Sequence, residues 1–128
     1  MPFILAVDYD GTLFNGSWPE GGSPKLDIVN KVKEFKKCGA EIVLWTCREG
    51  VSLEEALKRC KEEIDLEFDA VNLTAPSQVE YVKERLAEGE VFATRKIFAN
   101  FYLDDRSHNL EFFLKINVKA TCDRFKNP

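Results

Sequence analysis

The start of the chain limits its fold more than any other segment. A continuous apolar run from Phe3 to Val7 leads directly into the polar sequence Asp8-Tyr-Asp-Gly-Thr12. A short apolar run that ends at polar residues and a glycine is typical of a strand buried on both faces, as in a parallel sheet. We therefore expect the chain to begin with an interior strand whose carboxyl end carries two aspartates.

The remaining sequence alternates between helical and extended patterns. Apolar residues recur every three or four positions between Leu26 and Gly39, and capping-box patterns at Ser52 and Ser77 predict two further helices. More strands are predicted at 41–46, 68–73 and 97–103, and the tail indicates a short helix at 110–114 and a last strand at 116–120. This order predicts an α/β fold of three layers, Rossmann-like, with helices on both faces of a mostly parallel sheet.

Length and composition narrow the class of protein. A chain of 128 residues is the usual size of one domain, so we expect residues 1–128 to form a single unit. The net charge of -4 argues against a broad basic surface for nucleic acid. The apolar runs are too short to span a bilayer and the N-terminus lacks a signal pattern, so we expect no membrane partner and a cytoplasmic protein.

Polar side chains follow three of the predicted strands. They are Asp8, Asp10, Thr46, Cys47, Arg48, Asp104 and Asp105. Because the carboxyl ends of parallel strands meet at one edge of the sheet, these side chains should converge. Carboxylates this close disfavour each other's ionisation unless a cation compensates, and oxygen ligands with room for water and phosphate suit Mg²⁺.

The spacing within the first motif has its own chemistry. Asp8 and Asp10 project to the same side of an extended chain, and Gly11 allows the backbone to turn away sharply. One carboxylate can then attack phosphorus to form an aspartyl-phosphate, while the other transfers protons to the leaving oxygen and from water.

These residues resemble the motifs of the haloacid dehalogenase superfamily of phosphotransferases. Asp8-Tyr-Asp-Gly-Thr-Leu13 is similar to its first motif, the apolar run ending at Thr46 to its second, and Tyr102-Leu-Asp-Asp105 to its acidic fourth. The resemblance implies that Asp8 is the nucleophile and a magnesium ligand, and that Asp10 is the acid/base and binds the metal through its carbonyl.

The resemblance also implies roles for the residues of the other motifs. Asp104 would be the third protein ligand of the metal, and Asp105 would bind it through water. The Thr46 side chain and the following amide, that of Cys47, would hold the transferring phosphoryl oxygens. We expect the substrate to lie against Gly11, Thr12, Thr46, Cys47, Arg48 and Trp18.

The superfamily also supplies a lysine that neutralises the phosphate, and Lys96 is the first candidate. It lies eight positions before Asp104, so a straight strand would carry it roughly 26 Å away from the site. Lys96 fits only if residues 97–100 cross the sheet; Lys83 is the alternative. Lys96 and Arg48 could each be plain surface residues, Trp18 could cover the core edge, and Asp104-Asp105 could cap a helix starting at Ser107.

The intervals between the motifs leave no room for an inserted cap domain, so the chain resembles a small capless member. An open site suits a large phosphorylated substrate, or a small one enclosed by a partner subunit in a homo-oligomer. The leading hypothesis is a magnesium-dependent phosphomonoester hydrolase. The alternatives are a phosphotransferase of the same superfamily and a non-catalytic magnesium- or phosphate-binding regulatory module.

Overall fold

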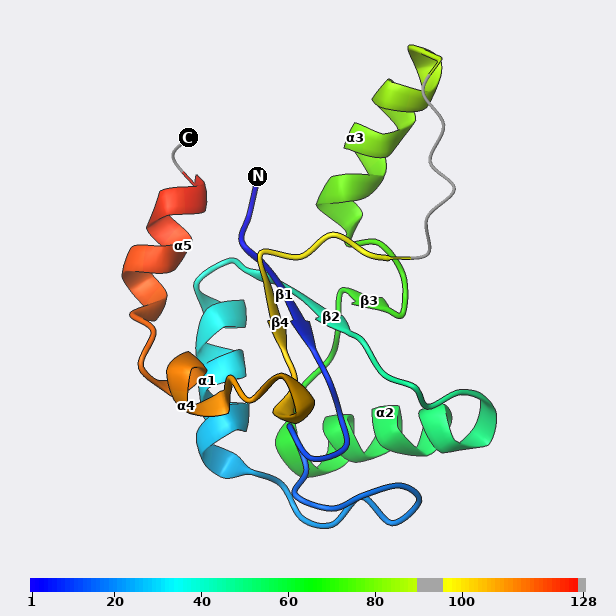
Figure 1. Ribbon diagram of the computed structural model, residues 1–128, viewed down its shortest axis with the longest axis vertical. Helices are drawn as coiled ribbons and strands as arrows, with labels where there is room; N and C mark the ends of the chain where they lie inside the picture. Colours follow the sequence, from blue (N-terminus) through cyan, green and yellow to red (C-terminus); the bar gives the residue numbers. More distant parts are fainter. Residues whose placement is uncertain (90–95, 127–128) are drawn as a thin grey trace.

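A four-stranded sheet forms the centre of the computed structural model, which describes residues 1–89 and 96–126 (Figure 1). The strands are β1 (Ile4–Val7), β2 (Glu41–Leu44), β3 (Ala70–Val71) and β4 (Phe101–Leu103). They lie in the order β3-β2-β1-β4, and all pairs are parallel. The apolar first segment is an interior strand, as predicted, and the α/β class is confirmed.

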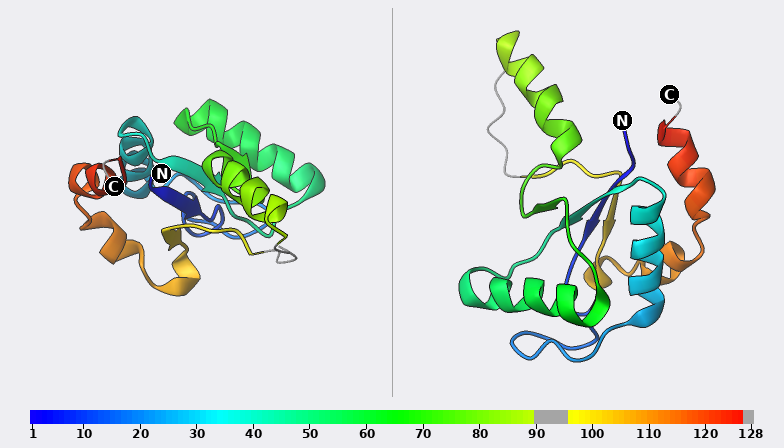
Figure 2. Two further views of the ribbon diagram at one scale, coloured as in Figure 1. Left: turned by 90° about the horizontal axis from the view of Figure 1, so that it is seen from above. Right: turned by 180° about the vertical axis from the view of Figure 1, so that it is seen from behind.

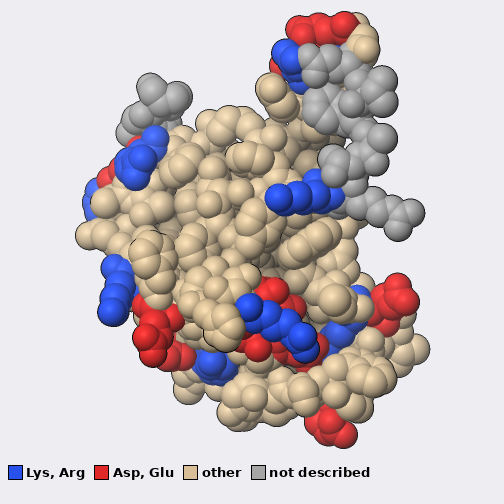
Figure 3. All heavy atoms as spheres, viewed as in Figure 1, with Lys and Arg blue, Asp and Glu red and all other residues tan. Residues whose placement is uncertain are grey.

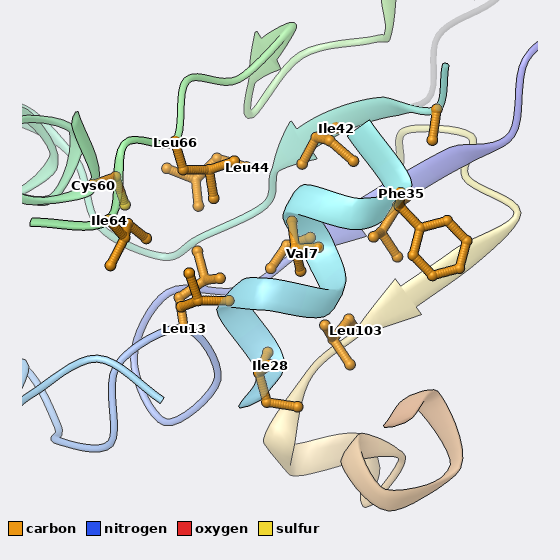
Figure 4. Close-up of a cluster of buried hydrophobic side chains, with 14 of the residues drawn as sticks. Val7, Leu13, Ile28, Phe35, Ile42, Leu44, Cys60, Ile64, Leu66 and Leu103 are labelled. Carbon is orange, nitrogen blue, oxygen red and sulfur yellow. The ribbon is translucent and has the colours of Figure 1, made fainter. Parts of the chain in front are cut away.

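Helices cover the sheet unequally (Figures 1 and 2). They are α1 (Leu26–Lys37), α2 (Gly50–Ile64), α3 (Pro76–Ala87), α4 (Leu110–Leu114) and α5 (Val118–Lys126). The main hydrophobic cluster joins one face of β1 and β2 to α1 and α2 (Figure 4). A smaller cluster on the other face joins Ile4, Ala6 and Val43 to Ala75, which precedes α3, and to Ile97.

The C-terminal segment differs from the sequence prediction. Residues 110–114 form the predicted short helix, but the strand predicted at 116–120 is wrong, because Val118–Lys126 is helical. Asn117 begins this helix, since its side-chain oxygen accepts the Ala120 N–H at 2.9 Å and its carbonyl accepts the Thr121 N–H at 3.0 Å. Val118 and Cys122 are both buried, and their four-residue spacing belongs to a helix face rather than a strand.

The two predicted capping boxes do not form. Helix α2 begins at Gly50, before Ser52, whose hydroxyl donates to the Glu49 carbonyl at 2.9 Å. Helix α3 begins at Pro76, a residue suited to the first helical position, and the Ser77 N–H donates to the Glu41 side chain at 3.1 Å. Neither serine is therefore the N-cap of its helix. Ser52 is bonded to Glu49, and Ser77 is bonded to Glu41 of β2.

The segments between the strands contain no inserted cap domain in residues 1–89 and 96–126. One loop and α1 connect β1 to β2, and α2 connects β2 to β3. Across these same ranges, no helix has the length and apolar character needed to cross a membrane.

Candidate active site

Strand register brings the sequence motifs together at one edge of the sheet. Val7 lies opposite Leu44 on β2 and opposite Leu103 on β4. The next residues of β1 and β4 are therefore neighbours, and the Asp8 N–H donates to the Leu103 carbonyl at 3.0 Å. Residues 8 and 104 thus lie side by side although 96 positions of sequence separate them.

Three carboxylates form an acidic cluster at this edge. One oxygen each from Asp8, Asp104 and Asp105 lies within 4.8 Å of the others. Burial, opposed by a hydrogen bond from the Tyr9 amide and reinforced by Asp104, Asp105 and Asp10, raises the pKa of Asp8 to about 7. Burial and repulsion from the neighbouring carboxylates thus both disfavour the charged form of Asp8, and the hard oxygen donors of the cluster fit Mg²⁺.

Thr12 and Gly11 hold Asp105 in place. The fully buried Thr12 hydroxyl accepts the Asp105 N–H at 3.0 Å and lies 3.4 Å from its carboxylate. Gly11 has a φ of +78°, and a Cβ there would lie only 2.4 Å from a carboxylate oxygen of Asp105. Thr12 was predicted to contact substrate. Its buried hydroxyl instead links the first motif to Asp105 of the fourth motif.

Asp104 has a second partner within its own segment. Its carboxylate accepts the Arg106 N–H at 2.9 Å and so begins the short 3₁₀ helix η1 (Asp105–Ser107). The Asn109 side chain accepts the Asp104 N–H at 3.3 Å and donates to the Tyr102 carbonyl at 2.8 Å. The helix-capping alternative for Asp104 is thus realised in a 3₁₀ helix that begins two residues before Ser107, and one carboxylate both caps η1 and joins the cluster.

Arg48 is a buried partner of Asp10. Its guanidinium donates two hydrogen bonds of 2.8 Å, one to each oxygen of the Asp10 carboxylate. It also lies 4.7 Å from the Tyr9 ring centre, and its side chain is 4 % exposed. These hydrogen bonds to Asp10 are the main reason that the pKa of Arg48 is raised. Arg48 therefore orients Asp10. Because its side chain is buried, it is not the plain surface residue that was the alternative prediction.

Thr46 follows β2 and faces the cluster. Its N–H donates to the Asn72 side chain at 2.8 Å, and its hydroxyl oxygen accepts the Arg48 N–H at 3.1 Å. A hydroxyl that accepts one hydrogen bond still has its own proton to donate, so Thr46 can bind an anionic oxygen. Asn72, with a φ of 51°, was not predicted as part of the site.

A cleft of about 570 Å³ opens over these groups. Its walls include the acidic cluster, Asp10, Gly11, Thr46 and Cys47, as well as Trp18 and Trp45. Among the described residues that line it, Arg106 is the only basic side chain. Figure 3 shows acidic and basic side chains gathered next to each other on this face, in the lower half of the view. Sequence reasoning did not single out Trp45 or Arg106.

Neither candidate lysine, Lys96 or Lys83, is among the described residues that line this cleft. Lys96 is exposed, and its Nζ lies 5.8 Å from the Tyr102 ring centre. Ile97 packs in the smaller cluster with Ile4, and the Asn100 N–H donates to the Ile4 carbonyl at 2.8 Å, so the chain before β4 runs past the start of β1, at the end of the strand opposite Asp8. Lys83 is exposed on α3 and pairs with Glu80 at 3.6 Å. A role for Lys96 stays a prediction.

The fold and the cleft define a small protein with a parallel α/β sheet and an acidic carboxyl edge. Its structure is similar to that of a conserved protein coded by a locus of Bacteroides thetaiotaomicron, with a TM-score of 0.66 and 28% sequence identity. The match covers 98% of this chain and 91% of that chain. No protein-family model matches the sequence, and no curated protein matches it.

Proposed function

We propose that this chain is a magnesium-dependent phosphomonoester hydrolase of the haloacid dehalogenase type, with Asp8 as its nucleophile. The observation that carries the proposal is the acidic cluster of Asp8, Asp104 and Asp105 at the carboxyl edge of a parallel sheet. It lies in a cleft large enough for a small phosphate ester.

The donor set supports a hard divalent cation. Asp8, Asp104 and Asp105 offer carboxylate oxygens, and burial together with the neighbouring carboxylates raises the pKa of Asp8, an effect that a bound cation would counteract. The Asp10 carbonyl is a further candidate ligand by resemblance. Bound Mg²⁺ would also draw negative charge from the phosphoryl oxygens, which favours attack at phosphorus.

The chain's own residues would carry the covalent step. An Asp8 carboxylate oxygen attacks phosphorus, the bond from phosphorus to the leaving oxygen breaks, and Asp10, which enters this step protonated, transfers its proton to that oxygen. In the second half, Asp10 takes a proton from water as the water oxygen attacks the aspartyl-phosphate and releases Asp8. Arg48 uses one acceptor position on each Asp10 oxygen, so further lone pairs are left for these transfers.

Three other residues are suited to hold the phosphoryl group. Thr46 can donate its hydroxyl proton to a phosphoryl oxygen, and the neighbouring Cys47 amide lies in the same loop. Arg106 is a candidate for the positive charge that the superfamily takes from lysine, because it lines the cleft beside the cluster.

A panel of phosphate monoesters tests the proposal. With Mg²⁺ the protein should release phosphate from at least one ester, and both EDTA and Asp8→Asn should abolish release. Asp123→Asn, a change at an exposed carboxylate of α5 paired with Lys119, is the matched control and should keep full activity. An inactive wild-type protein across the panel, in the presence of Mg²⁺, would falsify the hydrolase proposal.

A further inference from the structure

Trp18 is a large apolar side chain exposed at the rim of the cleft. Its relative exposure is 63 %, although it lines the same cleft as the acidic cluster. A scattered surface residue of this kind needs no explanation, but a tryptophan on a cleft wall presents a wide flat surface to any ligand. The question is whether the loop holds this surface in place.

The loop that carries Trp18 is internally bonded on both sides of it. The Asn15 N–H donates to the Ser23 carbonyl at 2.8 Å, and the Asn15 side chain accepts the Ser23 N–H at 3.0 Å. Nearer the tip, the Gly21 N–H donates to the Ser17 carbonyl at 2.9 Å and the Gly16 N–H to the Gly21 carbonyl at 3.1 Å. Trp18 therefore stands on a closed, hydrogen-bonded loop.

Two arginines from beyond β2 hold the same loop from below. Arg48 donates to the Pro19 carbonyl at 3.1 Å, and Arg59 of α2 donates to the Glu20 and Gly22 carbonyls at 3.2 and 2.7 Å. At Gly21, with a φ of +81°, an added Cβ would lie 2.9 Å from the Arg59 guanidinium. The loop thus fits closely over both side chains, and Arg48 ties it directly to Asp10.

We propose that Trp18 binds the leaving group of the substrate by stacking, and that this leaving group carries an aromatic ring. The inference rests on the proposed function, because it needs a phosphate ester seated on Asp8. Trp45 lines the same cleft, so a second tryptophan side chain borders the space that a planar leaving group would occupy. Stacking on tryptophan suits any aromatic ring, because every such ring has a π-face.

Paired substrates with the same reacting end test this assignment. Adenosine 5′-monophosphate and ribose 5-phosphate differ by the base alone, and 2-phenylethyl phosphate and 2-cyclohexylethyl phosphate differ by aromaticity. We expect kcat/KM to be higher for the aromatic member of at least one pair. Trp18→Ala should lower kcat/KM about tenfold for that aromatic substrate and less than twofold for the non-aromatic substrate of the same pair. The pair that responds distinguishes a nucleotide from a simple aryl ester.

Two further variants complete the experiment. Tyr81→Ala removes an exposed aromatic side chain on α3 and should change neither member of a pair, while Trp18→Phe should keep part of the preference. In Trp45→Phe, Trp18 is the sole tryptophan of the chain, so its fluorescence should be quenched on titration with adenosine or 2-phenylethanol, without metal or turnover.

The outcomes separate this inference from the proposed function. If esters are hydrolysed but Trp18→Ala lowers both members of each pair equally, the aromatic assignment is overturned and the hydrolase stands. If no ester is hydrolysed, the hydrolase proposal fails, and the titration alone decides. Saturable quenching of Trp18 then supports an aromatic binding site, and its absence overturns one.

Discussion

Replacing Asp8 with asparagine should stabilise the metal-free protein at pH 8. In the folded state the pKa of Asp8 is raised from 3.8 to about 7, first by burial and then by the neighbouring carboxylates. Above pH 7 the aspartate is charged in both the folded and the unfolded chain, and the folded chain carries the full cost of that charge. Between about pH 7 and 4 the folded chain binds more protons, so this cost falls as the pH falls.

The size of the effect follows from the same shift. A difference of about 3 pH units corresponds to about 4 kcal/mol at about 1.4 kcal/mol per unit. Asp8 is partly exposed to solvent, which screens its charge, so we expect about 2 kcal/mol for Asp8→Asn at pH 8. For a chain of this length that is a rise of about 6 °C in Tm.

Thermal unfolding followed by circular dichroism in EDTA measures this gain. It should be largest at pH 8 and shrink toward pH 5, and added Mg²⁺ should reduce it by stabilising the wild-type protein alone. Asp123→Asn, on the exposed surface of α5, should shift the free energy of unfolding by less than about 0.5 kcal/mol at either pH. If the Asp8→Asn protein were no more stable than wild type at pH 8, the charged Asp8 carboxylate would not destabilise the folded protein, and this prediction would be refuted.

Four other predictions test the parts around Asp8. Gly11→Ala should weaken Mg²⁺ binding measured by calorimetry, since its Cβ would meet Asp105, whereas Gly50→Ala, also at positive φ but in open space, should not; equal affinities in both would contradict this. Arg48→Met should lower the free energy of unfolding in urea by about 3 kcal/mol by leaving Asp10 without its partner, and Arg48→Lys should recover only part of it. Thr12→Val should lower the free energy of unfolding by about 1–2 kcal/mol and should also lower the rate of phosphate release. Thr121→Val in α5 should leave that rate unchanged. At pH 8 iodoacetamide should modify the exposed Cys47 and spare Cys60, whose pKa burial raises to about 12; equal labelling by mass spectrometry would argue against the buried thiol.

The carboxyl edge of the sheet was predictable because each of its motifs is a short run of consecutive residues that follows an apolar strand segment. The apolar segment before Asp8 is an interior strand, and β2 and β4 lie on either side of it. Because parallel strands end at one edge, the order of the motifs along the chain was enough to predict that Asp8 and Asp104 meet. The tail was less predictable, since Ile116 and Val118 fit an alternating strand pattern until Asn117 is seen to cap a helix.

The partners within the site could not be predicted in the same way. Arg48 was expected to contact substrate, which stays a prediction, but its bidentate pair with Asp10, 38 positions away in sequence, was not foreseen. Thr12 was expected there as well, yet its hydroxyl serves Asp105, 93 positions away. Such pairs depend on how a loop leaves its strand and where the next helix begins, and no local pattern of residue types encodes either.

The balance of charge at the edge argues for a divalent cation rather than a monovalent one. Arg48 forms a bidentate pair with Asp10 and so offsets one of the four carboxylates. The remaining three share a cleft in which Arg106 is the only basic side chain among the described lining residues. Two negative charges are then left over, which a single Mg²⁺ would match. A phosphate ester entering the same cleft adds more negative charge, so the ester should bind weakly to the metal-free protein and more tightly once Mg²⁺ is present.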